Sequence, residues 1–412
     1  MQMFGALRHR NFRLFIVGQF ISLCGTWMNI VALGWLVLGL TNSPFQVGLV
    51  TTLTAVPVLA LTLYGGVVAD RVDRHRLVTR LQSLMFVTAL VLATLTATHR
   101  ITIGWVMVLA VVSGTLSAFE IPARQSFFVD MVGKEDLFTA IAMNSSVFNV
   151  SRVLGPVFAG LVLAAAGAAL CFFADATSYL AVIASLLMMR FPHGPPRAAE
   201  STRPVAGELL EGVRYMRDTP LPRMLATLSM TFSIFGFSFV AMLPVFARDT
   251  LHTGSAGYGA LMSAVGVGAG SGAIAAAGFG HRFDRTKLVV PTGVVFALAL
   301  GLTALAPSLP WALVGLVFTG CAWVLNAIFT NTLLQTHAPD HLRGRVMGFY
   351  SFIAVGLAPL GALEMGWVAE RWGSRWAYGT AGIVCLIAGL IALRGARIQD
   401  RAAQDSPAIA AG

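Results

Sequence analysis

Two short charged stretches decide how this chain folds: residues 69–78 read ADRVDRHRLV and residues 280–289 read GHRFDRTKLV. Six of the ten positions are identical or conservatively matched, and the stretches lie 211 residues apart in a chain of 412. Each follows a long uncharged run that contains glycine. A chain that repeats the same charged turn once per half is expected to consist of two similar halves, which in a membrane is typical of transporters.

The composition assigns the chain to a membrane without help from the repeat. Hydrophobic residues make up 57% of the chain and charged residues only 11%, against about 25% charged in soluble domains. No Asp, Glu, Lys or Arg occurs between Leu14 and Ala69 or between Leu288 and Pro339. Because a helix crosses the hydrocarbon in about 20 residues, each run holds two spans, joined by tight turns at residues 41–44 and 306–310.

The same argument along the whole chain predicts an all-α membrane protein with twelve transmembrane helices in two pseudo-symmetric six-helix bundles. One long polar stretch, residues 191–219, divides the chain into six spans and six spans. We therefore expect an N-terminal bundle (1–190), a cytoplasmic central loop (191–219), a C-terminal bundle (220–395) and a cytoplasmic tail (396–412). The expected spans lie near residues 12–40, 45–68, 78–98, 102–124, 141–166, 168–190, 220–247, 255–281, 287–306, 310–335, 346–369 and 373–394.

The distribution of charge predicts the orientation. The net charge of +10 could suggest a nucleic-acid partner, but with both termini cytoplasmic, 23 of the 28 Lys and Arg residues fall on the inner side. This asymmetry follows the positive-inside rule for a cell inner-membrane protein and needs no anionic partner beyond the lipid bilayer. We expect no nucleic-acid partner.

Motifs for other functions are missing from the sequence. The four cysteines are scattered singly within spans, so no metal-binding spacing exists. No GxxxxGK[ST] motif occurs, and Gly268–Ala273, which matches G-x-G-x-x-A, lies inside a span where small residues pack helices. We expect neither a metal, nor a cofactor, nor an enzyme.

The first charged stretch resembles the signature loop of the major facilitator superfamily, G-x-x-x-D-R-x-G-R-[RK]. Here Asp73 replaces the usual glycine and His75 splits a basic pair. The matching positions are Gly66, Asp70, Arg71, Asp73, Arg74 and Arg76. The resemblance covers essentially the whole chain and implies the major facilitator fold, with two bundles around a central site that work by alternating access.

A narrower resemblance lies in spans 4 and 5. Residues 122–125 (PARQ) and 130–137 (DMVGKEDL) precede Asn144, Asn149, Arg152 and the element Gly155, Pro156 and Gly160. This pattern is similar to the branch that contains the enterobactin exporter and macrolide-type efflux proteins, and the Gly-Pro element resembles a span-5 helix-packing motif of proton-linked exporters. It implies export of a siderophore-like metabolite or a drug.

The charged stretches suggest a cytoplasmic latch. Asp70 would bind the start of span 11, where a helix N-terminus is partly positive, with Arg343 or Arg345 as ion-pair partner. The second copy supplies Arg282, Asp284 and Arg285, but His281 stands where Asp70 would be. We therefore expect the span 2–span 11 contact to dominate cytoplasmic closure. The alternative is that these charges only set the topology.

Charged residues inside spans indicate a pathway or a pair, because burying charge in a bilayer is costly. We hypothesise that Arg152 faces the central cavity and pairs with Glu120 or with an anionic group of the substrate; Arg124 follows Glu120 at i,i+4. A carboxylate that is paired in one state and exposed in another supports proton coupling. The alternatives are a static ion pair bracing spans 4 and 5 and, for Asp175, a carboxylate that meets water at the outer mouth.

Polar amides at cavity depth complete the candidate site: Asn29, Asn149 and Asn326. Hydrogen bonding between helices explains them equally well. We expect a monomeric, proton-coupled exporter of an amphiphilic small molecule. The alternatives are an importer or facilitator of the same fold, and a non-transporting receptor or scaffold.

Overall fold

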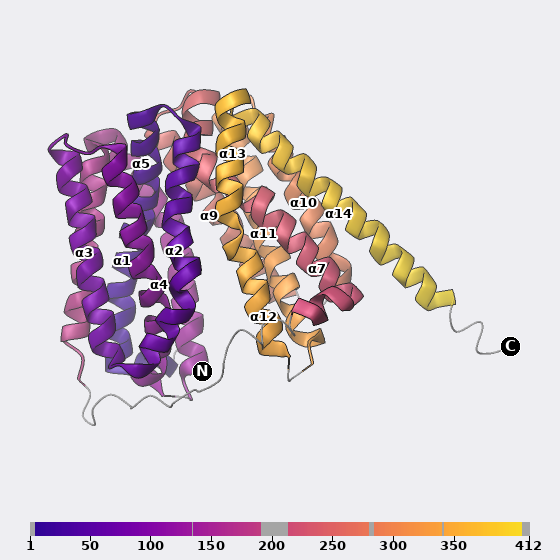
Figure 1. Ribbon diagram of the computed structural model, residues 1–412, viewed down its shortest axis with the longest axis horizontal. Helices are drawn as coiled ribbons and strands as arrows, with labels where there is room; N and C mark the ends of the chain where they lie inside the picture. Colours follow the sequence, from indigo (N-terminus) through magenta and orange to yellow (C-terminus); the bar gives the residue numbers. More distant parts are fainter. Residues whose placement is uncertain (1–4, 134, 191–212, 280–283, 340–341, 406–412) are drawn as a thin grey trace. The chain divides into compact units, whose positions relative to one another are not determined.

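The computed structural model describes residues 5–133, 135–190, 213–279, 284–339 and 342–405. Within these ranges eleven helices are long and apolar enough to cross a membrane, and no strand is present. After the short helix η1 (Gly5–Arg8), they are α1 (Arg10–Thr41), α2 (Pro44–Arg71), α3 (Arg74–Ala97), α4 (Ile103–Val132), α5 (Leu137–Leu187), the composite helix Pro220–Thr250, α9 (Ser255–Phe279), α10 (Arg285–Ala304), α11 (Leu309–His337), the composite helix Arg343–Trp372 and α14 (Ser374–Asp405) (Figure 1).

Helix α5 accounts for the difference between eleven helices and twelve predicted spans. It is 51 residues long and is broken at Gly167, whose φ of 78° and ψ of −179° are not helical. A straight helix of that length would measure about 75 Å, more than twice the hydrocarbon thickness. The break divides α5 into two arms, which supply the predicted fifth and sixth spans. Glycine suits this turn because positive φ is strained for other residues.

The first tight turn confirms its sequence signal. Helix α1 ends at Thr41, and Asn42 adopts the left-handed conformation with φ 51°. The Ser43 side chain then accepts a hydrogen bond from the Gln46 amide, 3.2 Å away, and Pro44 begins α2. Asparagine tolerates left-handed backbone, serine is a good N-cap and proline fits the first helical turn, so each residue suits its position.

Two spans are composite helices. The first contains α7 (Pro220–Thr231), η2 (Phe232–Gly236), η3 (Phe237–Met242), α8 (Leu243–Val245) and η4 (Phe246–Thr250). The second contains α12 (Arg343–Ser351), η5 (Phe352–Gly356) and α13 (Ala358–Trp372). The segments η2, η4 and η5 are π-helical, and Pro244 and Pro359 begin the α-helical turns that follow irregular backbone. Proline lacks an amide donor, so the regular hydrogen-bond ladder is interrupted there.

The chain divides into two compact units. The first contains α1 to α5 together with Ala241–Gly266, and the second contains the remaining described helices. In the first unit α1 packs along α5, α2 along α4, and α3 against α4 and α5. In the second, α10 packs against α11 and α14, and α13 packs against α14. The bundle boundaries at 190 and 220 remain predictions, and most of the predicted central loop lies outside the described residues.

Candidate functional site

Where the structure describes both charged stretches, each begins a helix at an aspartate N-cap. Asp73 is the N-cap of α3, with φ −61° and ψ 108°, and its carboxylate accepts a hydrogen bond from the Arg76 amide at 3.1 Å. Asp284 is the N-cap of α10, with φ −68° and ψ 108°, and accepts one from the Thr286 amide at 2.9 Å. An aspartate at the N-cap accepts a hydrogen bond from a free backbone amide, and its negative charge interacts favourably with the positive end of the helix dipole. The aspartate that replaces the usual glycine therefore starts a helix.

Ion pairs link the first charged stretch to α4. Arg74 lies 3.4 Å from Asp70 and 3.3 Å from Asp130. The Asp70 side chain is 51% exposed whereas that of Asp130 is only 5% exposed. Arg74 thus anchors α3 to α4 through the buried carboxylate of Asp130, while the carboxylate of Asp70 remains about half exposed. Arg71 is exposed, and Arg76 forms an exposed pair with Asp73 at 3.3 Å.

Close packing between α2 and α4 requires glycine at position 65, one residue before Gly66 of the signature motif. A Cβ on Gly66 would meet nothing within 4 Å, whereas a Cβ on Gly65 would lie 3.0 Å from the Phe119 Cα and closer still to the Ala118 carbonyl oxygen. Gly65 therefore allows α2 to approach α4.

The second half of the proposed latch is described in part. Arg282 and His281 lie outside the described residues. Arg285 is the first residue of α10, and Arg345 lies in the first turn of α12. Arg343 donates to the Gln335 carbonyl at 2.9 Å, which holds the start of α12 against the end of α11. Pairing of Asp70 with Arg343 or Arg345 stays a prediction.

Glu120 is the centre of a buried polar cluster between α3 and α4. Its carboxylate accepts hydrogen bonds from Arg124 at 2.8 Å and from Gln82 at 3.0 Å. Glu120 and Gln82 are both buried. Arg124 therefore balances the charge of Glu120 within one helix, and Gln82 ties that pair to α3. Pairing of Glu120 with Arg152 stays a prediction.

Asp175 and Asn29 meet between the second arm of α5 and α1. The Asn29 side-chain amide donates to Asp175 at 2.6 Å, and Asp175 is 2% exposed. Within the described part of the chain, the other carboxylate oxygen of Asp175 has no hydrogen-bond partner. One turn further along α5, Tyr179 shares a side-chain hydrogen bond with Thr26. Asp175 is thus buried inside the first unit. This burial does not agree with the alternative in which its carboxylate meets water at the outer mouth.

Arg152 lies on the first arm of α5 beside an aromatic ring. Its guanidinium carbon is 5.8 Å from the centre of the Trp27 ring, within the range of a cation–π contact. The Trp27 ring also meets the edge of Phe148, with ring centres 5.7 Å apart. Arg152 therefore lies beside α1, the helix that also supplies Asn29.

The Gly-Pro element packs α5 against two neighbouring helices. A Cβ on Gly155 would meet Trp27 and would lie 2.9 Å from the Cys24 carbonyl oxygen on α1. A Cβ on Gly160 would lie 3.0 Å from the Cα of Gly259 on α9. Pro156 is buried between these two glycines. Gly155 and Gly160 therefore allow α5 to approach the backbones of α1 and α9 closely, with Pro156 buried between them.

The remaining amides have local partners. Asn149 donates to the Ser145 carbonyl of its own helix at 2.8 Å. Asn326 is buried and donates to the Val289 carbonyl at 2.6 Å, which connects α11 to α10. For Asn326 the geometry favours interhelical bonding, the alternative to a cavity role. Among the described residues, no group of three or more His, Cys, Asp or Glu side chains is placed to hold a metal ion.

Sequence reasoning missed several of these contributors: Gly65, Gln82, Asp130 and Tyr179. Asp130 carries a usable signal, because it is a charged residue between Val129 and Met131, whereas Gln82 lies between Leu81 and Ser83 in a more polar stretch. Gly65 and Tyr179 could not be chosen without knowing which helix face is buried.

Comparison with known proteins identifies the family. The profile of the transmembrane secretion effector family, which belongs to the major facilitator superfamily, matches residues 1–410. The chain belongs to this family.

Relatives are similar to the chain along nearly their whole length. The chain is 26% identical to the multidrug efflux pump Tap of Mycolicibacterium fortuitum over 90% of this chain and 91% of that protein. It is 27% identical to the staphyloferrin A transporter of Staphylococcus aureus (91% and 94% covered) and 25% identical to the enterobactin exporter EntS of Shigella flexneri (93% and 91% covered). These relatives confirm the resemblance seen in spans 4 and 5.

The fold is confirmed by solved structures. The nucleoside transporter NupG superposes with a TM-score of 0.76 at 13% identity, with 93% of this chain and 98% of that chain covered. The chain is therefore a multi-pass membrane transporter of the major facilitator superfamily, and not an enzyme.

Proposed function

We propose that the chain is a proton-coupled exporter of an amphiphilic small molecule, either a siderophore-like metabolite or a drug, in the cell inner membrane. Both termini are cytoplasmic and the monomer is the working unit. The names of the relatives, which include a multidrug efflux pump and an enterobactin exporter, support this substrate class and direction. The charge asymmetry of the sequence supports the orientation.

The observation that carries proton coupling is the contrast between two buried carboxylates. Glu120 has a cationic partner in Arg124, at 2.8 Å. Asp175 has an amide partner, Asn29, and an oxygen that no described residue bonds. A carboxyl group whose access to water changes between two states also changes its affinity for a proton. Asp175 is therefore the better proton carrier of the two, and Glu120 with Arg124 is the better structural pair.

The substrate contacts follow from the same part of the first unit. Arg152 beside Trp27 offers a cation and an aromatic face, which suit an anionic, aromatic small molecule such as a catecholate. Asn29, next to Asp175, can sense whether that carboxyl carries a proton, because the amide can either donate to a carboxylate or accept from a carboxylic acid. Alternating access then couples proton binding to substrate release.

The test is substrate-panel transport in inverted membrane vesicles with an imposed pH gradient. We expect uptake into these vesicles to depend on the pH gradient. Asp175→Asn should remove that dependence, although the variant should still bind substrate. Asp218→Asn, a substitution at a carboxylate that is 60% exposed, is the matched control. Transport that proceeds equally fast without a gradient would reject proton coupling, and accumulation only in right-side-out vesicles would favour an importer.

The latch is the second part of the proposal. Asp70 keeps a half-exposed carboxylate although Arg74 lies 3.4 Å away. Asp70→Asn should reduce transport while leaving membrane insertion intact. A charge exchange, Asp70→Arg with Arg343→Asp or Arg345→Asp, should restore part of the activity if the two charges meet. Unchanged transport by Asp70→Asn would reject the latch and leave these charges as determinants of topology.

A further inference from the structure

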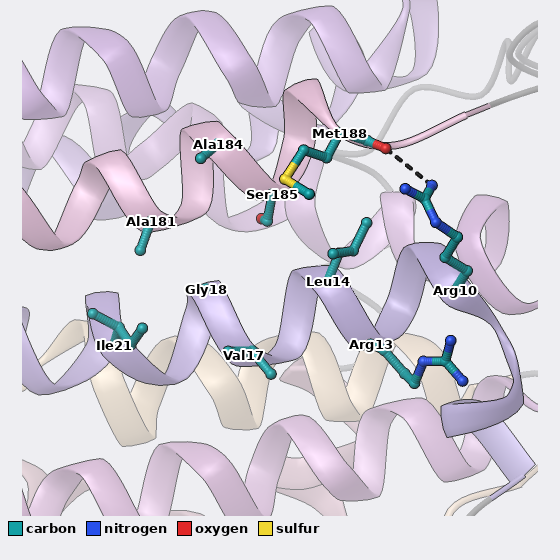
Figure 2. Close-up of a pocket in the computed structure, with 10 residues that line it drawn as sticks. All are labelled: Arg10, Arg13, Leu14, Val17, Gly18, Ile21, Ala181, Ala184, Ser185 and Met188. Carbon is teal, nitrogen blue, oxygen red and sulfur yellow. Dashed lines mark hydrogen bonds between the residues drawn. The ribbon is translucent and has the colours of Figure 1, made fainter.

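A pocket with a volume of 470 Å³ lies between the start of α1 and the end of the second arm of α5. Figure 2 shows its lining: helix α1 contributes aliphatic side chains and two arginines, α5 contributes small residues, and Met188, which follows α5, lies beside Ser185. The lining residues are Arg10, Arg13, Leu14, Val17, Gly18, Ile21, Ala181, Ala184, Ser185 and Met188. We propose that this pocket binds one anionic phospholipid.

The walls suit an acyl chain. Val17 and Ile21 are 60% and 45% exposed although they lie in a membrane-crossing helix. In a membrane such side chains meet lipid. The opposite wall consists of Ala181 and Ala184, whose small side chains leave the groove open (Figure 2).

The depth of the groove is set by a close approach of the two helices. A Cβ on Gly18 would lie 2.8 Å from the Ala181 carbonyl oxygen and 3.0 Å from the Ser185 hydroxyl. Gly18 therefore lets α1 reach the backbone of α5 and forms the floor. Leu14, Val17 and Ile21 of α1 line the groove beside this floor, so an elongated apolar ligand fits along it.

The arginines suit a phosphate. Arg10 donates one hydrogen bond to the Met188 carbonyl at 3.0 Å, and Arg13 donates a long one to the Leu7 carbonyl at 3.5 Å. A guanidinium has five N–H donors, so each keeps donors for a ligand. None of the ten lining residues is acidic. Two guanidinium groups at one end of an apolar groove can balance the charge of a phosphodiester, and each planar guanidinium can donate paired hydrogen bonds to its oxygens.

The arginines also lie at the right depth. Arg10 is the first residue of α1, and Met188 directly follows α5, so this end of the groove is at the end of two membrane-crossing helices. Lipid headgroups lie at that boundary, and basic pockets between transmembrane helices bind anionic headgroups. A lipid in this position would have its phosphate at the arginines and its chain along Val17 and Ile21.

The test is native mass spectrometry of the purified protein in a mixed micelle that contains phosphatidylglycerol and phosphatidylcholine with the same acyl chains. We expect one phosphatidylglycerol to be retained in preference to phosphatidylcholine, by about fivefold for each arginine. Arg10→Gln with Arg13→Gln should abolish the preference, and Arg80→Gln, at an exposed arginine on α3, should not.

Two further measurements separate the lipid from simpler explanations. Ala184→Phe fills the groove and leaves both arginines, so it should also abolish retention; Arg13→Gln alone, which spares the bond to Met188, should reduce it even if the double variant fails to fold. Excess inorganic phosphate should not displace the lipid. Equal retention of the two lipids, a preference that survives Ala184→Phe, or displacement by phosphate would each overturn the proposal.

Discussion

Arg248 donates a hydrogen bond to the side chain of Asn42, 2.9 Å away, although the two residues are 206 positions apart in the sequence. The same guanidinium donates to the Leu38 carbonyl at 3.1 Å. Asn42 is the left-handed C-cap of α1, so Arg248 binds the end of the helix where carbonyl groups are free and the dipole is negative. This contact holds η4 (Phe246–Thr250), the part of the composite helix around Arg248 that belongs to the first unit, against the end of α1.

Removing that contact should weaken the first unit. Arg248→Gln should lower the free energy of unfolding by about 1 kcal/mol, because the guanidinium is partly exposed and its charge is screened. Thermal unfolding of the purified protein in detergent measures this. Arg217→Gln is the control, since Arg217 is 83% exposed and lies 3.7 Å from Asp218. Equal melting of both variants would show that the α1 contact carries no stability.

Close packing of α5 on α9 gives a second prediction. A Cβ on Gly259 would lie 2.6 Å from the Pro156 carbonyl oxygen and 2.7 Å from the Gly160 Cα. Gly259→Ala should therefore destabilise the protein by about 1–3 kcal/mol through overpacking. Gly270→Ala on the same helix is a matched control, because its Cβ would meet nothing within 4 Å and alanine favours the helix. Equal melting temperatures of the two variants would show that α5 and α9 can move apart to accept the extra methyl group without a loss of stability, and would contradict the prediction.

The repeated caps give a third prediction. Asp73→Ala and Asp284→Ala should each cost about 1 kcal/mol, because each removes an N-cap hydrogen bond. Asp73→Asn and Asp284→Asn keep the cap and should cost much less. Thermal melting measures the stability that each N-cap contributes, and vesicle transport measures whether the negative charge has a separate role in transport. A loss of stability that is as large for asparagine as for alanine would mean that the charge, and not the cap, stabilises the turn.

The buried pair on α4 gives a fourth prediction. Glu120→Gln should destabilise the protein by about 3–5 kcal/mol, because Arg124 would keep a buried charge without a partner. Glu120→Gln combined with Arg124→Gln should recover much of that loss. A double-mutant cycle by thermal melting gives the coupling between the two residues. Additive effects of the two substitutions would show that each has another partner.

Much of the architecture could be predicted because the bilayer makes severe demands on the sequence. The uncharged runs fix the number of spans, and the residues of the 41–44 turn each suit the backbone they adopt. The site was harder. The partners of Asp130 and Gln82 lie on neighbouring helices, and the burial of Asp175 depends on how α1 packs on α5. A one-residue shift rotates a helix position by about 100°, so a motif that includes Gly66 does not reveal that the close contact with α4 is at Gly65.

The turn at Gly167 has a mechanical consequence. A single non-helical residue joins the arms of α5, so the connection has no slack and neither arm can slide along the other. The first arm carries Arg152 and Gly160, and the second carries Asp175 and Ala184. A displacement of the first arm at Gly167 therefore moves the start of the second arm with it. Inserting a few flexible residues at Gly167 would therefore uncouple the movements of the two arms.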